Sequence, residues 1–178
     1  MISLELAKKH LVVDHDEDDV LIQGLIKAAY LHAENKTNTC FEPKEVTITL
    51  DHLPHGAEPI KLDVTPVREV VEFSFVDPQG DTLELPAETM RLDKRPLYPT
   101  LAPQFGTSWP KTIAEPESVH ITLAVGYEET PADAQAAMLL MIGNWYANRE
   151  SVVIGTISSS LPMGVSMLLE PYMIRSIG

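Results

Sequence analysis

One segment, residues 130–150, constrains the fold of this chain more than any other. It begins as helices begin, with a capping hydroxyl at Thr130 and proline at the first helical position. Asp133 then places a carboxylate in the positively polarised first turn. These features predict a helix that starts at Pro131 and continues to about Glu150.

This predicted helix is apolar almost all round. Between residues 134 and 147 the only clearly polar side chains are Gln135 and Asn144. A surface helix of a globular protein keeps one polar face, so a helix without such a face has to be covered on more than one side. The rest of the chain looks too small and too rich in loops to wrap it. We therefore expect a neighbouring subunit to complete the cover, which indicates an assembly protein rather than an enzyme.

The charge balance bears on nucleic acid as a partner. The 178-residue chain has 26 acidic and 13 basic residues, a formal net charge of −13. Affinity for nucleic acid comes mainly from Lys and Arg side chains that displace counterions from phosphates. The chain is therefore not expected to grip DNA. An acidic surface would nevertheless suit a channel through which DNA slides as a transient passenger.

Cysteine use and hydropathy indicate a soluble cytoplasmic protein. Cys40 is the only cysteine, so neither a disulfide within the chain nor a Cys-based zinc site is possible. The N-terminus lacks the basic start and the long apolar run of a signal peptide. The longest apolar run, residues 136–143, is far shorter than the roughly 20 residues of a transmembrane helix. We expect no export and no membrane partner.

The hydrophobic period changes twice along the chain. Two helices are predicted first, a short one capped by Ser3 and a longer one that starts in the acidic cluster 14–19. The middle of the chain alternates apolar and polar residues as half-buried strands do, and the last part is helical again. These changes predict an α+β fold. In it, a small helical bundle of residues 1–40 and 127–178 carries an inserted β-rich subdomain, residues 41–126.

The inserted zone combines strand patterns with one long loop. Apolar and polar residues alternate at positions 46–50, 67–76, 82–85 and 119–125. In the second of these strands, Val71, Phe73 and Phe75 are predicted to share one face. Five prolines between residues 95 and 116 predict a long extended loop without a regular element.

The acidic cluster 14–19 is the obvious candidate for a metal site. Its Asp-x-Asp-x-Asp start is similar to that of an EF-hand loop, but that loop needs Gly at its sixth position and Glu at its twelfth, where this chain has Asp19 and Leu25. We interpret the cluster as a helix N-terminus whose carboxylates suit the helix dipole. We expect no metal and no cofactor.

Signatures of catalysis are also missing from the sequence. The histidines have no zincin spacing, and there is no nucleophile elbow, phosphate loop or dinucleotide fingerprint. The alternative from another class is a small metal-dependent hydrolase that uses His10, His15 and the acidic cluster. It would need ligands that converge from several elements around a pocket. We assign no catalytic residue.

Two sets of residues are candidates for protein contacts. Aromatic side chains in the proline-rich loop, Phe105 and Trp109, are predicted to dock a protein partner, together with Tyr172 and Arg175 near the C-terminus. Tyr98 belongs to the same loop. The Ser-rich stretch 151–160 and the C-terminus are expected to become ordered on docking. Residue type further predicts a subunit interface on the apolar helix, formed by Leu139, Ile142, Trp145, Tyr146 and Arg149.

Segments at both ends of the chain, in the expected order, carry a family resemblance. They are ISLELAKKHLVVD at residues 2–14, DDVLIQGLIKAA at 18–29, PADAQAAMLLMIGNWYANRE at 131–150, and LPMGV with LLEPY at 161–172. Together they cover roughly half of the chain and resemble the head–tail connector (adaptor) proteins of long-tailed bacteriophages, also described as DNA-packaging proteins. The long middle zone is similar to a subgroup that carries a β insertion.

The resemblance implies a structural protein of the virion neck, assembled in the host cytoplasm. About twelve copies would form a ring beneath the portal protein, since head-to-tail contacts between identical subunits close into rings. Such a ring extends the DNA channel, helps to retain packaged DNA and docks the next neck or tail protein. No catalysis and no cofactor belong to this family. A tail-completion or other neck protein is the alternative that remains within the same class.

Overall fold

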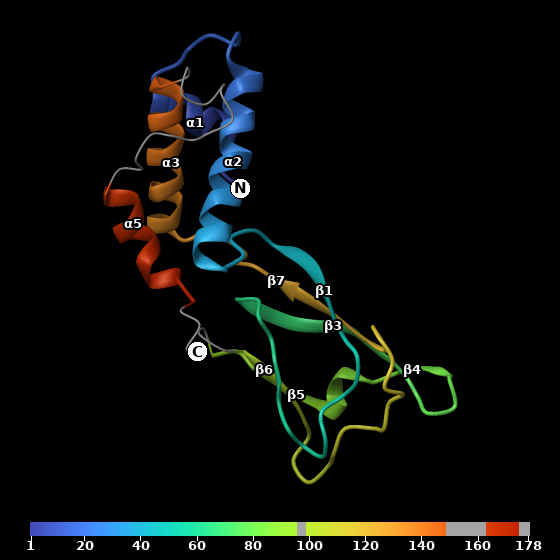
Figure 1. The fold of residues 1–178 in the computed structure, drawn as a ribbon. Coiled ribbons are helices and arrows are strands. Elements are labelled where there is room, and N and C mark those ends of the chain that lie inside the picture. The colour runs from blue at the N-terminus through green and yellow to red at the C-terminus, as the bar shows by residue number, and fades with distance from the viewer. Residues whose placement is uncertain (96–98, 149–162, 175–178) are drawn as a thin grey trace. The chain divides into compact units, whose positions relative to one another are not determined.

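The computed structural model describes residues 1–95, 99–148 and 163–174, which fall into two compact units (Figure 1). We call residues 1–41 with 128–178 the helical unit, and residues 42–127 the β unit. Helices and antiparallel sheets occur together, so the predicted α+β class is confirmed. None of the described helices is both long and apolar enough to cross a membrane.

The described part of the helical unit consists of helices, and some of them begin or end at residues that favour helix capping. They are α1 (Leu4–Leu11), α2 (Asp19–Thr37), α3 (Ala132–Ala147), α5 (Met163–Leu169) and the 3-10 turn η2 (Glu170–Tyr172). The predicted cap of α1 is confirmed, because Ser3 Oγ accepts a hydrogen bond from the Leu6 N–H at 3.1 Å. Asn38 ends α2 in the left-handed conformation, with φ 55°.

The start of α3 differs from the prediction. The helix begins at Ala132, one residue later than expected, and Thr130 does not cap it. The Thr130 hydroxyl instead lies 3.1 Å from the Tyr30 hydroxyl and donates to the Phe41 carbonyl oxygen at 3.3 Å. Thr130 therefore ties the entry of α3 to α2 and to the end of the first chain segment.

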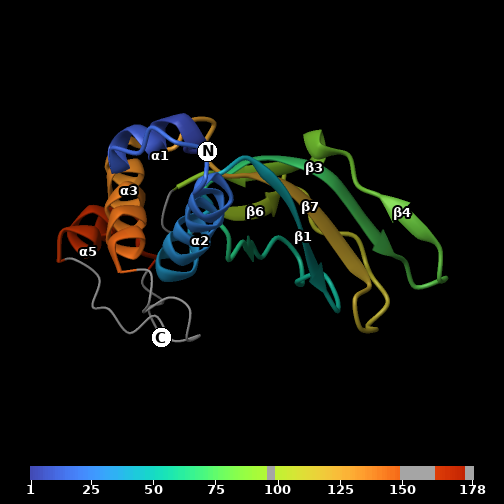
Figure 2. The ribbon, with the colours of Figure 1, turned by 90° about the horizontal axis from the view of Figure 1, so that it is seen from above.

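The surroundings of α3 show that its own chain covers one broad face of the helix and leaves another open. Figures 1 and 2 both show α3 between α2 and α5, and α1 packs against both α2 and α3. One broad face of α3 is buried by these helices, through Ala134, Ala137, Met138, Met141, Ile142 and Trp145. Each large apolar side chain buried in this way contributes about 1.5 to 3 kcal/mol. The exposed residues of α3 are Ala132, Ala136, Leu140 and Ala147, and several others, Leu139 and Tyr146 among them, are half-buried.

The β unit contains two antiparallel sheets. The larger sheet has the strand order β1-β7-β3-β4, and the smaller has the order β2-β6-β5. Their strands are β1 (Lys44–Leu50), β2 (Ile60–Lys61), β3 (Val67–Val76), β4 (Thr82–Glu84), β5 (Met90–Asp93), β6 (Thr100–Pro103) and β7 (Val119–Val125); the 3-10 turn η1 (Ala87–Thr89) precedes β5. The core is formed by one face of the larger sheet, with Phe73, Ile121 and Leu123, and by Leu101 of β6.

A bulge changes which residues of β3 share a face. Phe73 and Phe75 are buried as predicted, but Val71 is half exposed. The pairing of β3 with β7 slips between Val70 and Glu72, so one extra residue interrupts the alternation. The predicted grouping of Val71 with the two phenylalanines is therefore wrong.

The proline-rich loop also contains a strand that the prolines concealed. Residues 100–103 form β6, which pairs with β2 and β5. Pro103 stands at the last position of the strand, where its missing N–H does least harm to the ladder. The prediction of a loop without regular structure from residue 95 to 116 is wrong at these four residues.

A glycine closes the base of the β unit. Gly126 follows β7 with φ 90°, and a Cβ atom at this position would lie 1.9 Å from the carbonyl oxygen of Glu42. The backbone just before β1 therefore passes directly against the backbone just after β7. This contact fixes the end of the sheet at which Lys44 pairs with Val125.

Candidate functional site

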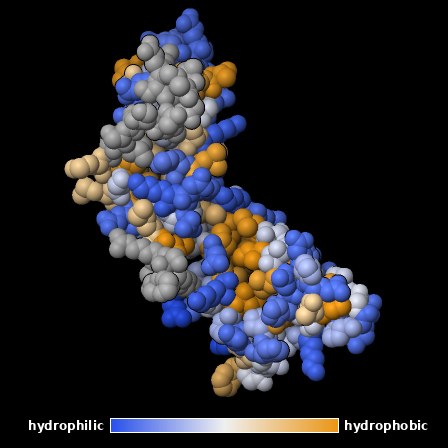
Figure 3. Space-filling model, viewed as in Figure 1, coloured by the Kyte–Doolittle hydropathy of each residue, from blue (hydrophilic) through white to orange (hydrophobic). Residues whose placement is uncertain are grey.

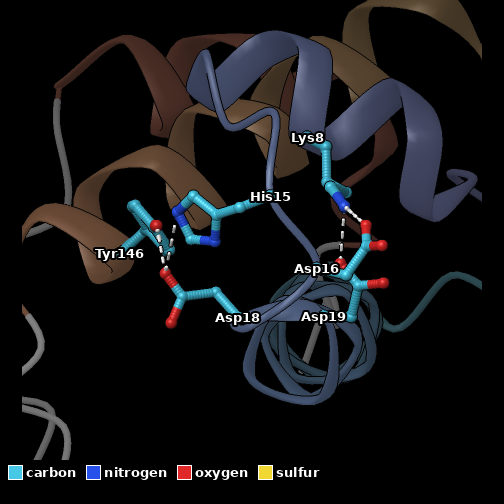
Figure 4. A network of polar contacts seen from close by, with 6 residues as sticks. All are labelled: Lys8, His15, Asp16, Asp18, Asp19 and Tyr146. Carbon is cyan, nitrogen blue, oxygen red and sulfur yellow. Dashed lines mark hydrogen bonds and ion pairs between the residues drawn. The ribbon is translucent and has the colours of Figure 1, made fainter.

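The loop between α1 and α2 holds a network of polar contacts (Figure 4). Lys8 Nζ of α1 donates to Asp16 Oδ1 and to Asp19 Oδ1, both at 2.7 Å. The hydrogen bond to Asp16, and to a smaller extent the one to Asp19, raises the pKa of Lys8. The same bond from Lys8 lowers the pKa of Asp16. One cation thus holds the acidic loop against α1.

A second contact joins the same loop to α3. The Tyr146 hydroxyl donates to Asp18 Oδ2 at 2.6 Å, and His15 Nε2 lies 4.0 Å from the same oxygen (Figure 4). Asp18 directly precedes α2, and Tyr146 lies in the last turn of α3. The carboxylate therefore fixes the position of one helix end relative to the other.

The acidic cluster does not have the geometry of a metal site. Its carboxylates are spread over different partners, Asp16 and Asp19 on Lys8 and Asp18 on Tyr146. In the described ranges, no group of three or more His, Cys, Asp or Glu side chains could hold a metal ion. The carboxylates of the cluster instead hold the ends of helices α1, α2 and α3 together through hydrogen bonds.

The residues predicted for a subunit interface lie in different environments. Ile142 and Trp145 are fully buried inside their own helical unit, where they pack α3 against its neighbours. Leu139 and Tyr146 are half-buried. Arg149 lies outside the described residues. The presence of these side chains in a subunit interface stays a prediction, and only the half-buried ones have surface to contribute in this conformation.

Trp145 shares its buried position with a histidine of α2. The rings of His32 and Trp145 meet edge to face, with centroids 6.1 Å apart. Burial, and then the charge of Lys36, lower the pKa of His32. Within the described part of the chain, Trp145 Nε1 and His32 Nε2 have no hydrogen-bond partner. This pair is held by packing rather than by polar contacts.

Exposed apolar side chains gather on the two helices that flank α3. On α2 they are Val20, Leu31 and, less exposed, Leu21, and on α5 they are Met163 and Met167. Figure 3 shows apolar side chains that stand out where α5 forms the edge of the helical unit, and others on the side of α2. Sequence reasoning missed these residues because it concentrated on α3. The signal on α2 is weak, because the line that holds Val20 and Leu31 also holds Gly24 and Lys27.

The predicted docking residues also separate into buried and exposed ones. Phe105 is 92% exposed and lies in a turn where Gln104 is anchored by hydrogen bonds to the Glu88 and Met90 carbonyl oxygens. Trp109 is instead part of the core. Its ring stacks on Phe73 with centroids 5.8 Å apart, and its Nε1–H donates to the Glu58 carbonyl oxygen at 2.8 Å.

Near the C-terminus the described docking candidate, Tyr172, contacts residues of its own helical unit. The Tyr172 hydroxyl donates to Asp133 Oδ1 of α3, and its ring packs edge to face on Phe41 with centroids 5.4 Å apart. Arg175, the Ser-rich stretch 151–160 and Tyr98 of the proline-rich loop lie outside the described residues. Among the predicted docking residues that the structure describes, Phe105 has the most exposed side chain.

Comparisons with known proteins fit these features. Residues 1–71 match the model of the phage gp6-like head-tail connector protein family. No curated protein matches the chain. The predicted resemblance to head–tail connectors is confirmed by the family match.

Solved structures with a similar fold come from particles of a gene transfer agent (GTA). A chain in the neck of the empty GTA particle, computed with C6 symmetry, is 19% identical, has a TM-score of 0.80, and covers 99% of this chain and 92% of its own. A chain in the virion of the native particle is 21% identical, with TM-score 0.78 and the same coverage of 99% and 92%. A chain in the neck of the native particle, computed with C12 symmetry, is 21% identical, with TM-score 0.74 and coverage of 100% and 96%. At these identities the likeness shows the fold, which extends over both units.

Proposed function

We propose that this chain is a structural head–tail connector, one of several identical copies in the neck of a phage or phage-like particle. The observation that carries the proposal is the match of residues 1–71 to the connector family. Those residues include both N-terminal helices and reach into β3. The likeness in fold to neck chains over both units supports the same role.

The role is mechanical rather than catalytic. The polar side chains around the α1–α2 loop hydrogen-bond one another, with Lys8 on two carboxylates and Tyr146 on a third. Such an arrangement holds helices in place. A catalytic site would instead direct an acid, a base or a nucleophile into a cavity that admits substrate. The proposal includes no cofactor and no metal.

We propose that the assembly is a ring, since identical head-to-tail contacts close into rings. The proposed number of copies is about twelve. The C6 and C12 symmetries of the neck structures with this fold support a multi-copy ring. One side of the ring would bind the portal protein and the other the next neck or tail protein. The formal charge of −13 would repel DNA phosphates, so the genome could slide through the channel without adhering.

Docking of the next neck component is proposed to use Phe105. Its exposed ring is presented by a turn that Gln104 holds in place, so little side-chain and loop order is lost when a partner binds. Phe105→Ala should weaken binding of that partner by at least about tenfold, as loss of an aromatic anchor does. Leu83→Ala, at another exposed apolar position of the β unit, is the matched control. Equal binding by both variants would remove Phe105 from the interface.

The test of the function is co-assembly. The full-length chain is produced with the portal protein of the same genome and, separately, with its tail-tube protein, and each mixture is analysed by native mass spectrometry. A ring of this chain on the portal is the expected result. Association with the tail tube alone would assign the chain to tail completion. A chain that stays monomeric in both mixtures would overturn the proposal.

A further inference from the structure

We infer that neighbouring copies of this chain join edge to edge, with the α5 edge of one copy packed on the α2 edge of the next. The α2 edge consists of Val20, Gly24, Lys27 and Leu31, and the α5 edge of Leu140, Met163 and Met167. The inference rests on the proposed ring and names the contact that closes it.

The α2 edge is one line of residues along the helix. Positions 20, 24, 27 and 31 follow the spacing that places side chains on a single face, opposite the buried face with Ile26 and Ala33. Val20 is 84% and Leu31 61% exposed. Two large aliphatic side chains on the same line, outside the core of their own unit, form an apolar surface that another protein can cover.

Gly24 lies in the middle of this edge, and no contact with the described part of its own subunit requires a glycine there. A Cβ atom added at Gly24 would meet no atom within 4 Å, and its backbone is helical. Glycine weakens a helix relative to alanine, so it is expected where close approach requires it. The missing side chain leaves a notch between Val20 and Lys27. A helix from outside the subunit can approach there closely.

The α5 edge is formed by flexible apolar side chains. Met163 and Met167 are 83% and 71% exposed and are four residues apart, which places them about 6 Å from each other along the helix axis. Leu140 of α3 lies beside Gly164, the residue after Met163, since its Cδ1 atom is 3.8 Å from the position of a Cβ atom added at Gly164. Methionine is unbranched and flexible, and it fills irregular apolar gaps. The two side chains therefore suit the notch at Gly24.

The occupant of each edge is a second copy because the two edges differ and flank the same row of helices. Figures 1 and 2 show α3 between α2 and α5, so the row runs α2, α3, α5. A cyclic ring needs two different surfaces that bind each other, whereas one surface that binds itself gives only a closed dimer. When α2 of the next copy follows α5, the row of helices continues around the ring.

Cross-linking tests the contact directly. In the full-length chain with Cys40→Ala, the pair Leu31→Cys and Met167→Cys is treated with a short bismaleimide. A ladder of covalent oligomers beyond the dimer is expected, because each copy carries both reactive edges. The control pair, Val12→Cys and Met167→Cys, also places cysteines at two exposed apolar positions, but Val12 lies off the α2 edge. The same ladder from both pairs, or from neither, would overturn the contact.

A second variant separates assembly from folding. Gly24→Leu adds a better helix former at a position with open space around it, so its urea midpoint should equal or exceed that of the unaltered chain. The added side chain fills the notch, and ring formation measured by native mass spectrometry should weaken at least about tenfold, as when a hot-spot contact is lost. Gly24→Leu rings as stable as those of the unaltered chain would overturn the inference and leave the proposed function intact. An unaltered chain that never forms a multi-copy assembly, alone or on the portal, would overturn both.

Discussion

The hydroxyl of Tyr146 donates a hydrogen bond to Oδ2 of Asp18, 2.6 Å away, and so connects two residues that are 128 positions apart in the chain. Tyr146 lies in the last turn of α3, and Asp18 is the residue before α2. The bond joins the N-terminal and C-terminal contributions to the helical unit. Tyr146 thus links two helices of its own subunit, and its presence in a subunit interface stays a prediction.

Removal of this bond should destabilise the helical unit. A hydrogen bond to a charged group contributes about 1.5 to 3 kcal/mol when buried, and partial exposure reduces the expected loss for Tyr146→Phe to about 1 kcal/mol. Urea unfolding followed by circular dichroism measures the change. Asp18→Asn keeps an acceptor oxygen at the same place and should lose less than Tyr146→Phe. Equal free energies of unfolding for Tyr146→Phe and the unaltered chain would contradict the role of the bond.

The ion pairs of Lys8 should make stability depend on pH on the acid side. Hydrogen bonding to Lys8 holds the pKa of Asp16 below its ordinary value. The folded state therefore binds the proton less readily than the unfolded state, and the contribution is present above the ordinary carboxyl pKa of about 3.9 and is lost as the pH falls below it. In Lys8→Met this contribution is absent at every pH.

The measurement compares urea midpoints of the unaltered chain and Lys8→Met from neutral pH downward. The difference between the two should be constant near neutrality and should shrink once the pH falls below about 4. Lys9→Met removes a charge from the exposed neighbouring position and serves as the control. A difference for Lys8→Met that does not change with pH, or that Lys9→Met reproduces, would show that general charge rather than the specific pair is responsible.

The sequence predicted the helices well because their signals are local. Ser3 caps α1 as its position indicates, and the apolar run after Pro131 is helical. What covers that run could not be predicted, since it depends on α1, α2 and α5 arriving from distant parts of the chain. The burial of Ile142 and Trp145 within their own unit could not be predicted, because the helices that bury them are distant in the sequence.

In the β unit, the limits of prediction have different physical causes. The strand at residues 67–76 was predicted with its observed bounds. The bulge at Val71 depends on how β3 pairs with β7, and the alternation of apolar and polar residues in one strand does not determine its pairing with another. Residues 100–103 were hidden by the prolines around them, although a short strand can hold a proline at its end. The bond between Tyr146 and Asp18 required the three-dimensional fold.

Replacement of Trp145 by alanine should destabilise the fold of the single chain. Its indole is buried against the His32 ring, and truncation of a buried tryptophan to alanine costs about 3 to 5 kcal/mol. Trp145→Ala should lower the urea midpoint by the same amount at dilute and at concentrated protein, because the lost contacts lie within one chain. Leu139→Ala, at a half-buried position of the same helix, should cost less. A decrease in the urea midpoint that appears only at concentrations where copies associate would show that Trp145 contacts a neighbouring subunit.

Val12 ends α1 in a conformation that suits its side chain poorly. It adopts φ 58° and ψ 41°, the left-handed region, in which a β-branched residue is strained, and it is 91% exposed, so no packing compensates. Asn38 occupies the same conformation at the end of α2, with a residue type that tolerates it. Val12→Gly should therefore stabilise the chain by about 1 kcal/mol despite the added freedom of glycine in the unfolded state, and Val12→Asn by a similar or smaller amount.

Urea unfolding of both variants is the measurement. Val20→Asn is the control, because it makes the same change at an exposed valine inside a helix, where it should destabilise. A lower midpoint for both Val12 variants would show that the valine side chain makes a contact that outweighs its backbone strain.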